Sequence, residues 1–393
     1  MAILKMTDMD LSGRRVLIRV DFNVPIKNGK ITSEKRLLAS LPTLKLAVEQ
    51  GAKVMVMSHL GQPAEGQFDQ NFSLRPVAEW LSEHFGKPIR LESNWLDGVE
   101  VAEGELVLFE NVRFNLGEKK NDEALAKKMA NLCDVFVMDA FATAHRAQAS
   151  TCGVAKFAEI AVAGPLLMQE IDALSRALEK PQKPLMAITG GSKVSTKLQL
   201  LENFLTKVDF LLLGGGIANT FLLAKGYNIG KSLCEVDFVD KAREILAVAE
   251  RNKVEIPLPV DVVVTKEINS DSRGEIKEMT NVDCDDIILD IGPKTSSNLA
   301  KMIENVKTII WNGPVGMFEL DEFGKGTEVI ARAVADSSAF TLVGGGDTIA
   351  AIEKFKILPN CFSYVSTAGG AFLEYLQGIE LPAIKILKIR GEN

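Results

Sequence analysis

The strongest constraint on the fold is a repeated order of segments, in which a short apolar run, a polar or glycine-rich segment and a helical pattern follow one another. Residues 15–20 and 53–58 are two such apolar runs, and between them Leu37, Leu41 and Leu44 recur at helical spacing. A strand, helix, strand order implies that the two strands pair in parallel. The chain therefore predicts an α/β fold built on parallel sheets.

Polar side chains follow the predicted strands of the first half at the point where each strand ends. The segments are Asp21-Phe22-Asn23, His59-Leu60-Gly61-Gln62, the arginine of Glu110-Asn111-Val112-Arg113 and the arginine of Ala144-His145-Arg146. One arginine after a strand is usually a solvated surface charge, but successive strand ends of a parallel sheet meet at one edge. Guanidinium groups pair carboxylate and phosphate bidentately, so this edge is expected to bind a small anion.

Glycines take the place of these charges in the second half. The strand ends carry Gly190-Gly191, Gly214-Gly215-Gly216, Gly344-Gly345-Gly346-Asp347-Thr348 and Gly369-Gly370, and helical patterns follow. A glycine turn that leads onto a helix N-terminus is a common anion cradle. A nucleotide is therefore the expected ligand of this half.

Two further features of the second half refine that expectation. Lys193 and Lys197 lie four residues apart on what we expect to be the helix after Gly190-Gly191, so that both ammonium groups face one point. Asp347 is unusual in an anion cradle, and its carboxylate suggests Mg²⁺ held between it and the phosphates. The Gly369-Gly370 amides could stabilise phosphoryl oxygens during transfer.

A helical stretch separates the two halves. Gly164-Pro165 is a helix start signal, and Leu167, Ile171 and Leu174 recur on one face before Pro184. The chain of 393 residues is long enough for two domains. We expect two doubly wound, Rossmann-like parallel-sheet domains that are joined by this helix, with a cleft between them. The predicted boundaries are 1–163 for the first domain, 164–184 for the helix, 185–375 for the second domain and 376–393 for a C-terminal tail.

Composition excludes several classes of protein. A net charge of -7 argues against nucleic acid and anionic membranes as partners, and no apolar run is long enough to span a bilayer. The five cysteines form no C-x-x-C pair, so we expect reduced thiols in a cytoplasmic protein. The nucleotide fingerprint G-x-G-x-x-G is absent, which removes the main support for a dinucleotide-binding dehydrogenase.

Taken together, the motifs resemble those of the phosphoglycerate kinase family, in the family's order and over nearly the whole chain. The matching segments are Val20-Asp21-Phe22-Asn23-Val24-Pro25, Ser58-His59-Leu60-Gly61, Glu110-Asn111-Val112-Arg113-Phe114, Thr143-Ala144-His145-Arg146, Gly190-Gly191-Ser192-Lys193, Trp311-Asn312-Gly313-Pro314-Val315-Gly316 and Gly344-Gly345-Gly346-Asp347-Thr348.

The resemblance implies specific ligand-binding residues. On the substrate side they are Asp21, Phe22, Asn23, Arg36, His59, Leu60, Gly61, Gln62, Arg113 and Arg146. On the nucleotide side they are Lys197, Gly214, Gly215, Gly292, Glu319, Gly345, Gly346, Asp347 and Thr348, with residues 214–221 flanking the adenine and Asp347 as the ligand of Mg²⁺. The family also implies that residues 381–393 return to the first domain.

Three residues depart from the family pattern. Gln62 stands where arginine is usual, and this removes a charge from the substrate side. Ala142 and Ala368 stand where glycine is usual, so their backbone is expected to avoid positive φ.

The expected reaction is reversible transfer of the acyl phosphate of 1,3-bisphosphoglycerate to MgADP, which gives 3-phosphoglycerate and ATP in glycolysis. The attacking and leaving groups are already anionic, so positioning and charge neutralisation suffice. The candidate catalytic groups are Arg36, Lys193, Lys197, Gly369 and Gly370. We expect a monomer whose two halves close about the connecting helix. Two alternatives remain, a kinase of another small carboxylate and a non-catalytic sensor of adenine nucleotides.

Overall fold

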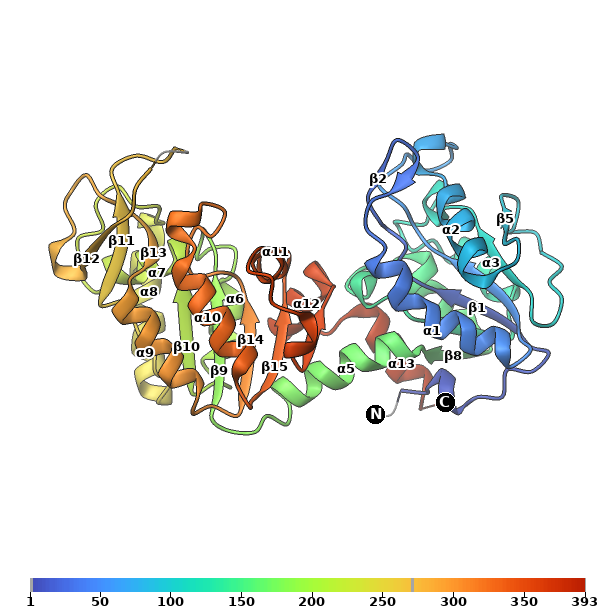
Figure 1. The fold of residues 1–393 in the computed structure, drawn as a ribbon. Helices are drawn as coiled ribbons and strands as arrows, with labels where there is room; N and C mark the ends of the chain where they lie inside the picture. Colours follow the sequence, from blue (N-terminus) through green and yellow to red (C-terminus); the bar gives the residue numbers. More distant parts are fainter. Residues whose placement is uncertain (1–2, 270–271, 393) are drawn as a thin grey trace. The chain divides into compact units, whose positions relative to one another are not determined.

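The computed structural model describes residues 3–269 and 272–392 and divides into two compact units. The first comprises Met1–Asp172 together with Glu380–Asn393, and the second comprises Ala173–Ile379. Figure 1 shows the helices and strands of each unit. Among the described residues, no helix combines the length and the apolar composition needed to cross a bilayer.

A six-stranded sheet forms the centre of the first unit, in the order β5-β6-β4-β1-β7-β8. All of its pairs are parallel, as the strand, helix, strand pattern predicts. Its strands are β1 (Arg15–Arg19), β4 (Lys53–Met57), β5 (Arg90–Glu92), β6 (Leu106–Phe109), β7 (Val135–Met138) and β8 (Ile160–Ala163). After β1, the chain adds β4, β5 and β6 on one side of β1 and then β7 and β8 on the other side. This reversal places a crevice for ligands beyond the carboxyl ends of β1 and β7.

Helices and a hairpin complete the first unit. They are β2 (Ile26–Lys27), β3 (Lys30–Ile31), α1 (Lys35–Glu49), α2 (Arg75–Phe85), α3 (Glu123–Asn131), α4 (Val154–Phe157) and α13 (Pro382–Arg390). The hairpin turns at Asn28 and Gly29, as predicted, and both residues have the positive φ that a tight two-residue turn needs. Helix α13 packs against α4 and β8, although it follows the whole second unit in the chain.

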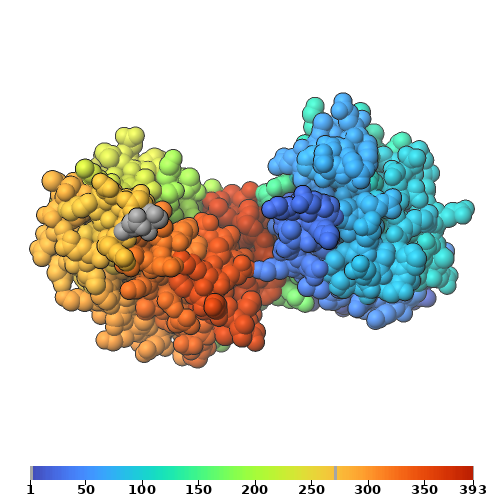
Figure 2. Space-filling model, turned by 45° about the horizontal axis from the view of Figure 1, so that its top comes forward, coloured from blue at the N-terminus to red at the C-terminus, as the bar shows by residue number. Residues whose placement is uncertain are grey.

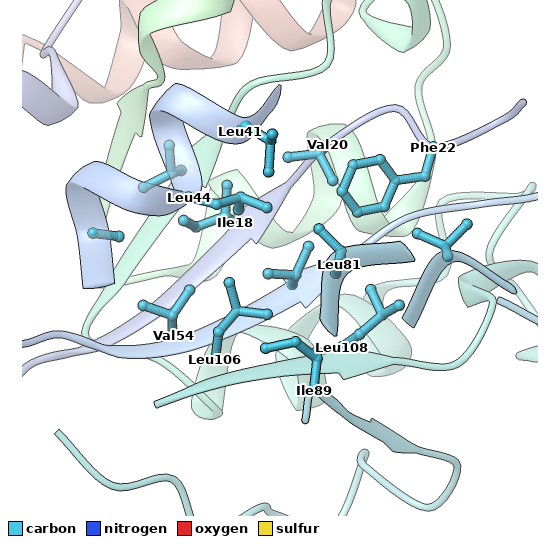
Figure 3. Packing of buried hydrophobic residues seen from close by; sticks show 14 of the residues in the cluster. Ile18, Val20, Phe22, Leu41, Leu44, Val54, Leu81, Ile89, Leu106 and Leu108 are labelled. Carbon is cyan, nitrogen blue, oxygen red and sulfur yellow. The ribbon is translucent and has the colours of Figure 1, made fainter. Parts of the chain in front are cut away.

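The hydrophobic core of the first unit joins one face of the sheet to α1 and α2. Figure 3 shows Ile18, Val54 and Leu106 from three strands beside Leu44 of α1 and Leu81 of α2. All five side chains are at most 1% exposed. Full burial of an aliphatic side chain of this size stabilises the fold by about 1.5–3 kcal/mol. The core thus fixes the strands whose ends carry the polar segments.

A five-stranded parallel sheet forms the centre of the second unit, in the order β10-β9-β14-β15-β16. Its strands are β9 (Leu185–Gly190), β10 (Phe210–Gly214), β14 (Thr308–Asn312), β15 (Phe340–Gly344) and β16 (Tyr364–Ser366). Its helices are α6 (Leu198–Phe204), α7 (Gly215–Ala224), α8 (Val239–Asn252), α9 (Pro293–Ile303), α10 (Lys325–Asp336), α11 (Gly346–Lys354) and α12 (Gly369–Leu376). Here the order of strands reverses between β9 and β14, which makes their ends the expected ligand site.

The second unit also holds a three-stranded antiparallel sheet that we did not predict. It is built from β11 (Asp261–Thr265), β12 (Glu275–Glu278) and β13 (Ile287–Ile291), in the order β12-β11-β13. This part of the chain, drawn in yellow to orange, lies at the surface of the unit in Figure 2. The two parallel sheets confirm the predicted fold class, and the third sheet adds to it.

The predicted connecting helix is present as α5 (Pro165–Leu178). It begins one residue after Gly164, and Leu167 and Leu174 on its apolar face are fully buried. The limit between the two compact units falls inside it, after Asp172. It is shorter than the predicted range 164–184, because residues 179–184 are not helical.

Candidate ligand-binding sites in the two units

Three predicted substrate residues meet beyond the end of β1. Nη1 of Arg36, on the first turn of α1, lies 3.0 Å from Oδ2 of Asp21 and donates a 2.8 Å hydrogen bond to the carbonyl of Asn23. Oδ1 of Asn23 accepts a 2.9 Å hydrogen bond from the amide of Gly61, after β4. These contacts fix the position of the Arg36 guanidinium group relative to the ends of two neighbouring strands.

His59 lies next to Asp21 and is 2% exposed. Its Nδ1 lies 3.2 Å from Nη2 of Arg19 and 3.9 Å from Oδ1 of Asp21. Burial lowers the pKa of His59 well below 6.5, and the neighbouring arginines, with Arg19 first, lower it further. His59 is therefore neutral at physiological pH.

Two more predicted arginines contribute to the same positive region. Arg113 is 3% exposed, and its Nη1 donates to the carbonyl of Gly61. Its Nε is buried without a hydrogen-bond partner among the described residues. Burial, together with the charges of Arg146 and Arg19, lowers the pKa of Arg113 to about 10. An anion placed here would relieve both the repulsion between guanidinium groups and the missing hydrogen bond.

The remaining residues predicted on the substrate side are placed differently. Phe22 and Leu60 point into the hydrophobic core and are 0% and 5% exposed, so their side chains cannot touch a ligand. Gly61 has a φ of +57°, and a Cβ there would lie 2.3 Å from the ring of Phe72. Gln62 is exposed beyond this turn. Only backbone atoms of Phe22 and Leu60 remain available for binding.

Two buried charged residues were missed by the sequence analysis. Arg19, the last residue of β1, and Glu118 are both 0% exposed. Ser150 joins them, because its Oγ accepts a 3.0 Å hydrogen bond from Nε of Arg19 and donates a 2.6 Å hydrogen bond to Oε1 of Glu118. The position of Arg19 inside the apolar run 16–20 could have indicated a buried ion pair or hydrogen-bond network, since a charged side chain in a buried strand needs a partner.

Lys197 occupies the point where the order of strands reverses in the second unit. Its Nζ donates to the carbonyl of Gly190 at the end of β9 (2.7 Å), and to Oδ1 and the carbonyl of Asn312 at the end of β14 (2.7 and 2.9 Å). Burial lowers the pKa of Lys197 to about 8, and the charge of Asp347 acts in the opposite direction. Three oxygen acceptors within 2.9 Å match the three N–H groups of the ammonium form.

Close packing of backbone explains several glycines around this lysine. A Cβ on Gly190 would lie 1.6 Å from the carbonyl oxygen of Pro314, and one on Gly214 would lie 2.4 Å from Cα of Val315. Gly215 has a φ of +64° and begins α7. The ends of β9, β10 and β14 are thus in contact, and no side chain at these positions would be tolerated.

The glycine segment after β15 leads directly into α11. Gly345 has a φ of +98°, and Gly346 and Asp347 form the first turn of the helix. The Asp347 carboxylate is exposed and forms no salt bridge among the described residues. In contrast, Thr348 is fully buried and its Oγ1 accepts a 2.7 Å hydrogen bond from the amide of Gly313. Gly369 and Gly370 are exposed at the start of α12.

Lys193 does not lie on a helix with Lys197. Residues 191–194 are irregular, residues 195–197 form a turn, and α6 begins only at Leu198. Lys193 is exposed, whereas Lys197 is largely buried. The expectation that a common helix directs both ammonium groups to one point was therefore wrong.

A small hollow of about 20 Å³ adjoins the start of α7. It is lined by Gly215, Ala218, Asn219, Leu222, Pro259, Val262, Ile288, Leu289, Asp290, Ile291 and Val315. This is where residues 214–221 were expected to flank a base. Gly292, the residue before α9, comes directly after Ile291, which lines the hollow. A Cβ on Gly292 would lie 2.2 Å from the carboxyl carbon of Asp261. Glu319 is exposed on the loop after β14.

Comparisons with known proteins agree on one family. A family model described as phosphoglycerate kinase matches residues 6–379. The solved structure of phosphoglycerate kinase from Coxiella burnetii has 56% sequence identity and a TM-score of 0.97, and the match covers 99% of this chain and 100% of that chain. Phosphoglycerate kinase from Pyrococcus horikoshii OT3 has 33% identity and a TM-score of 0.81, with 99% and 100% coverage.

Proposed function

The chain belongs to the phosphoglycerate kinase family, and from this membership we propose how its own residues divide the work of that reaction. The enzyme is a phosphotransferase of glycolysis with nucleotide substrates. It transfers the acyl phosphate of 1,3-bisphosphoglycerate reversibly to ADP, which gives 3-phosphoglycerate and ATP. The observation that carries the residue assignment is the group of buried or half-buried arginines around His59 in the first unit.

The glycerate substrate is assigned to the carboxyl edge of the first sheet. The side chains proposed to hold it are Asp21, Asn23, Arg36, His59, Arg113 and Arg146, with Gln62 and the backbone of residues 22 and 60–61 at the margin. Two of these arginines are held in place by protein carbonyls, Arg36 by Asn23 and Arg113 by Gly61. Preoriented guanidinium groups lose little conformational entropy when they bind carboxylate or phosphate.

The nucleotide is assigned to the carboxyl edge of the second sheet. We assign phosphate binding to Lys197, Gly345, Gly346 and Thr348, and base and ribose binding to Gly214, Gly215, Gly292 and Glu319. Helices α7 and α11 begin there, and the positive end of each helix dipole favours phosphate. Thr348 supports this site through its hydrogen bond to Gly313.

Enzymes of this family generally use their nucleotides with Mg²⁺, and we propose Asp347 as its protein ligand. The fit is good, because an exposed carboxylate that forms no salt bridge with any described residue lies on the first turn of α11. Mg²⁺ commonly binds through one or two carboxylates together with substrate phosphates. When bound, the ion would neutralise phosphate charge.

For the transfer step, no side chain need remove a proton, because the attacking oxygen is already anionic. We assign the transferring phosphoryl group to Arg36, Lys193 and Lys197, with the Gly369 and Gly370 amides at the start of α12 as further donors. Donors that are fixed before the reaction stabilise developing charge without reorganisation. That the two units close around bound ligands stays a prediction, which small-angle scattering with both ligands can test. The enzyme is proposed to act as a monomer in the cytoplasm.

A coupled assay tests the assignment of the reaction. We expect ATP to form when 1,3-bisphosphoglycerate and ADP are supplied with Mg²⁺, and no ATP with other acyl phosphates such as acetyl phosphate. Turnover of another acyl phosphate at a similar rate would favour a kinase of another small carboxylate. Binding of MgADP without turnover would favour a nucleotide sensor.

A further inference from the structure

The contact between Arg19 and His59 determines which ring nitrogen of the histidine carries the proton. Nη2 of Arg19 lies 3.2 Å from Nδ1 of His59. A guanidinium group has only N–H donors, so Nδ1 must accept this hydrogen bond. The single proton of the neutral ring is then on Nε2. No described residue accepts a hydrogen bond from Nε2, which leaves this N–H available to a ligand.

The competing arrangement would place the proton on Nδ1 and direct it at Asp21. The separation of 3.9 Å between Nδ1 and Oδ1 of Asp21 is too long for a hydrogen bond. Both carboxylate oxygens of Asp21 also have other partners, since Oδ2 pairs with Arg36 and Oδ1 accepts from the amide of Asn23. Asp21 therefore does not hold a proton on Nδ1.

The charges that surround His59 also oppose a doubly protonated ring. Arg19 comes from β1, Arg36 from α1, Arg113 from the turn after β6 and Arg146 from the segment after β7. The acidic groups nearby are Asp21 and Glu118, and each is already paired with an arginine or a serine. A further positive charge at His59 would lie among four guanidinium groups and out of water.

Arg19 holds its position through a buried chain of hydrogen bonds. Its Nη1 donates to the carbonyl of Val20, and its Nε donates to Oγ of Ser150 over 3.0 Å. The Ser150 hydroxyl donates in turn to Oε1 of Glu118 over 2.6 Å, and the Ser150 amide donates to Oε2 over 2.9 Å. Arg19, Ser150 and Glu118 are all 0% exposed. A hydrogen-bonded set with this degree of burial has little freedom to rearrange.

We propose that Glu118 and Ser150 form a buried brace that orients Arg19, and that Arg19 thereby holds His59 as the neutral tautomer with its proton on Nε2, ready to donate to an anionic oxygen of the substrate. Only the identity of that oxygen rests on the proposed function. Arg19, Ser150 and Glu118 are then positioning residues. His59 acts as a neutral hydrogen-bond donor and neither as a cation nor as a proton shuttle.

Nitrogen NMR of the full-length protein, labelled with ¹⁵N at histidine, tests the tautomer directly. We expect His59 to keep the signals of the neutral ring protonated on Nε2 from about pH 8 to about pH 5.5. His84 is an internal contrast, because its Nδ1 lies 2.9 Å from the carbonyl of Trp80 and must donate when the ring is neutral. Substitutions H84Q and H145Q assign the signals. A proton on Nδ1 of His59, or a titration of His59 in this range, would overturn the proposal.

Variants test the brace. In Ser150→Ala and in Glu118→Gln we expect His59 to show a mixture of tautomers, whereas Ser150→Thr keeps a hydroxyl and is expected to restore the single form. Ser82→Ala is the matched control, because Ser82 makes a similar 2.7 Å hydrogen bond on α2, away from the brace. If Ser150→Ala keeps the pure Nε2–H signals in a folded protein, the brace does not set the tautomer.

Kinetics separate this inference from the proposed function. With the tautomer lost in Ser150→Ala, KM for 3-phosphoglycerate is expected to rise about tenfold, with kcat changed by less than about twofold, because a hydrogen bond to charged substrate is lost. A tautomer shift without any change in KM would support the brace and contradict the contact between His59 and the substrate. An unchanged tautomer would contradict the brace, whatever the assay of ATP formation shows.

Discussion

Nζ of Lys197 lies 2.7 Å from Oδ1 of Asn312, and this contact joins the segment after β9 to the end of β14. Together with the two carbonyl acceptors, it occupies all three N–H groups of the ammonium ion. A phosphate that binds to Lys197 must therefore replace one of these oxygens. We expect a phosphate to replace Oδ1 of Asn312, because the side-chain amide of Asn312 also donates to the carbonyl of Gly344 and would keep that hydrogen bond.

Replacing Lys197 by methionine should weaken nucleotide binding. The substitution keeps an unbranched apolar side chain and removes the charge, and a hydrogen bond to a charged group contributes about 1.5–3 kcal/mol. We expect Kd for MgADP to rise at least about tenfold. Calorimetric titration measures it, and Lys231→Met, at an exposed lysine of the same unit, serves as the control. Unchanged affinity for MgADP would remove Lys197 from the nucleotide site.

Lys193→Ala should separate catalysis from binding. Lys193 is exposed and has no salt bridge among the described residues, so its ammonium group is free to reach a bound phosphoryl group. We expect a large fall in kcat, on the order of a hundredfold, with little change in KM for either substrate. Lys225→Ala removes an exposed charge elsewhere in the second unit and should have no effect. Turnover near that of the wild type would show that Lys193 takes no part in transfer.

Gln62→Arg should strengthen binding of the glycerate substrate. Gln62 is exposed next to the turn at Gly61, whose carbonyl holds Arg113, and an added guanidinium group there can reach an anion bound to the arginines. We expect a lower KM for 3-phosphoglycerate, and a gain that shrinks as ionic strength rises. Gln67→Arg adds the same charge to an exposed position of the same loop as a control. If both variants behave alike, the effect is one of general charge and not of contact.

The stability of the second unit should depend on pH through Asp290. Burial raises the pKa of this carboxyl from 3.8 to about 7, while its oxygens accept hydrogen bonds from the amides of Gly326 and Ile291. The folded state therefore binds the proton more tightly than the unfolded state. The stabilisation that this gives is complete below about pH 4 and is lost as pH rises to about 7.

Asp290→Asn tests the direction of this pH dependence of stability. Asparagine does not titrate but gives up one acceptor, at a pH-independent cost of about 1 kcal/mol. The variant should be slightly less stable than the wild type at about pH 3.5, and it should become the more stable of the two at pH 8. Urea unfolding followed by Trp311 fluorescence, in a background of Trp80→Phe and Trp95→Phe, reports on this unit. Equal deficits at both pH values would contradict the raised pKa.

The parallel sheets could be predicted because their strands are continuous apolar runs, as expected for strands that are covered on both faces. Strand β1 is fully buried after its first residue, and β6 and β7 are buried throughout. In the antiparallel sheet β11 and β13 carry apolar runs, but the edge strand β12 does not. Strand β12 reads Glu-Ile-Lys-Glu and is mostly exposed, so neither alternation nor an apolar run distinguishes it from a loop.

Site residues could be predicted where the residue type itself indicates the chemistry. They could not be predicted where tertiary contacts determine the role of a residue. Arg113 and Arg146 were identified at the ends of strands and Arg36 through the family resemblance, and the structure places all three near His59. Arg19 was missed because it continues an apolar run, and its partner Glu118 lies 99 positions away in sequence. The spacing of Lys193 and Lys197 suggested a helix, but both residues precede α6.

Helix α13 has a consequence for synthesis of the chain. Because it packs against α4 and β8 but follows the second unit in sequence, the first unit lacks one of its covering helices until the ribosome has made residues 382–390. The second unit, continuous over Ala173–Ile379, can finish folding first. The first unit of the nascent chain is thus incompletely covered until a segment that follows the whole second unit has been made.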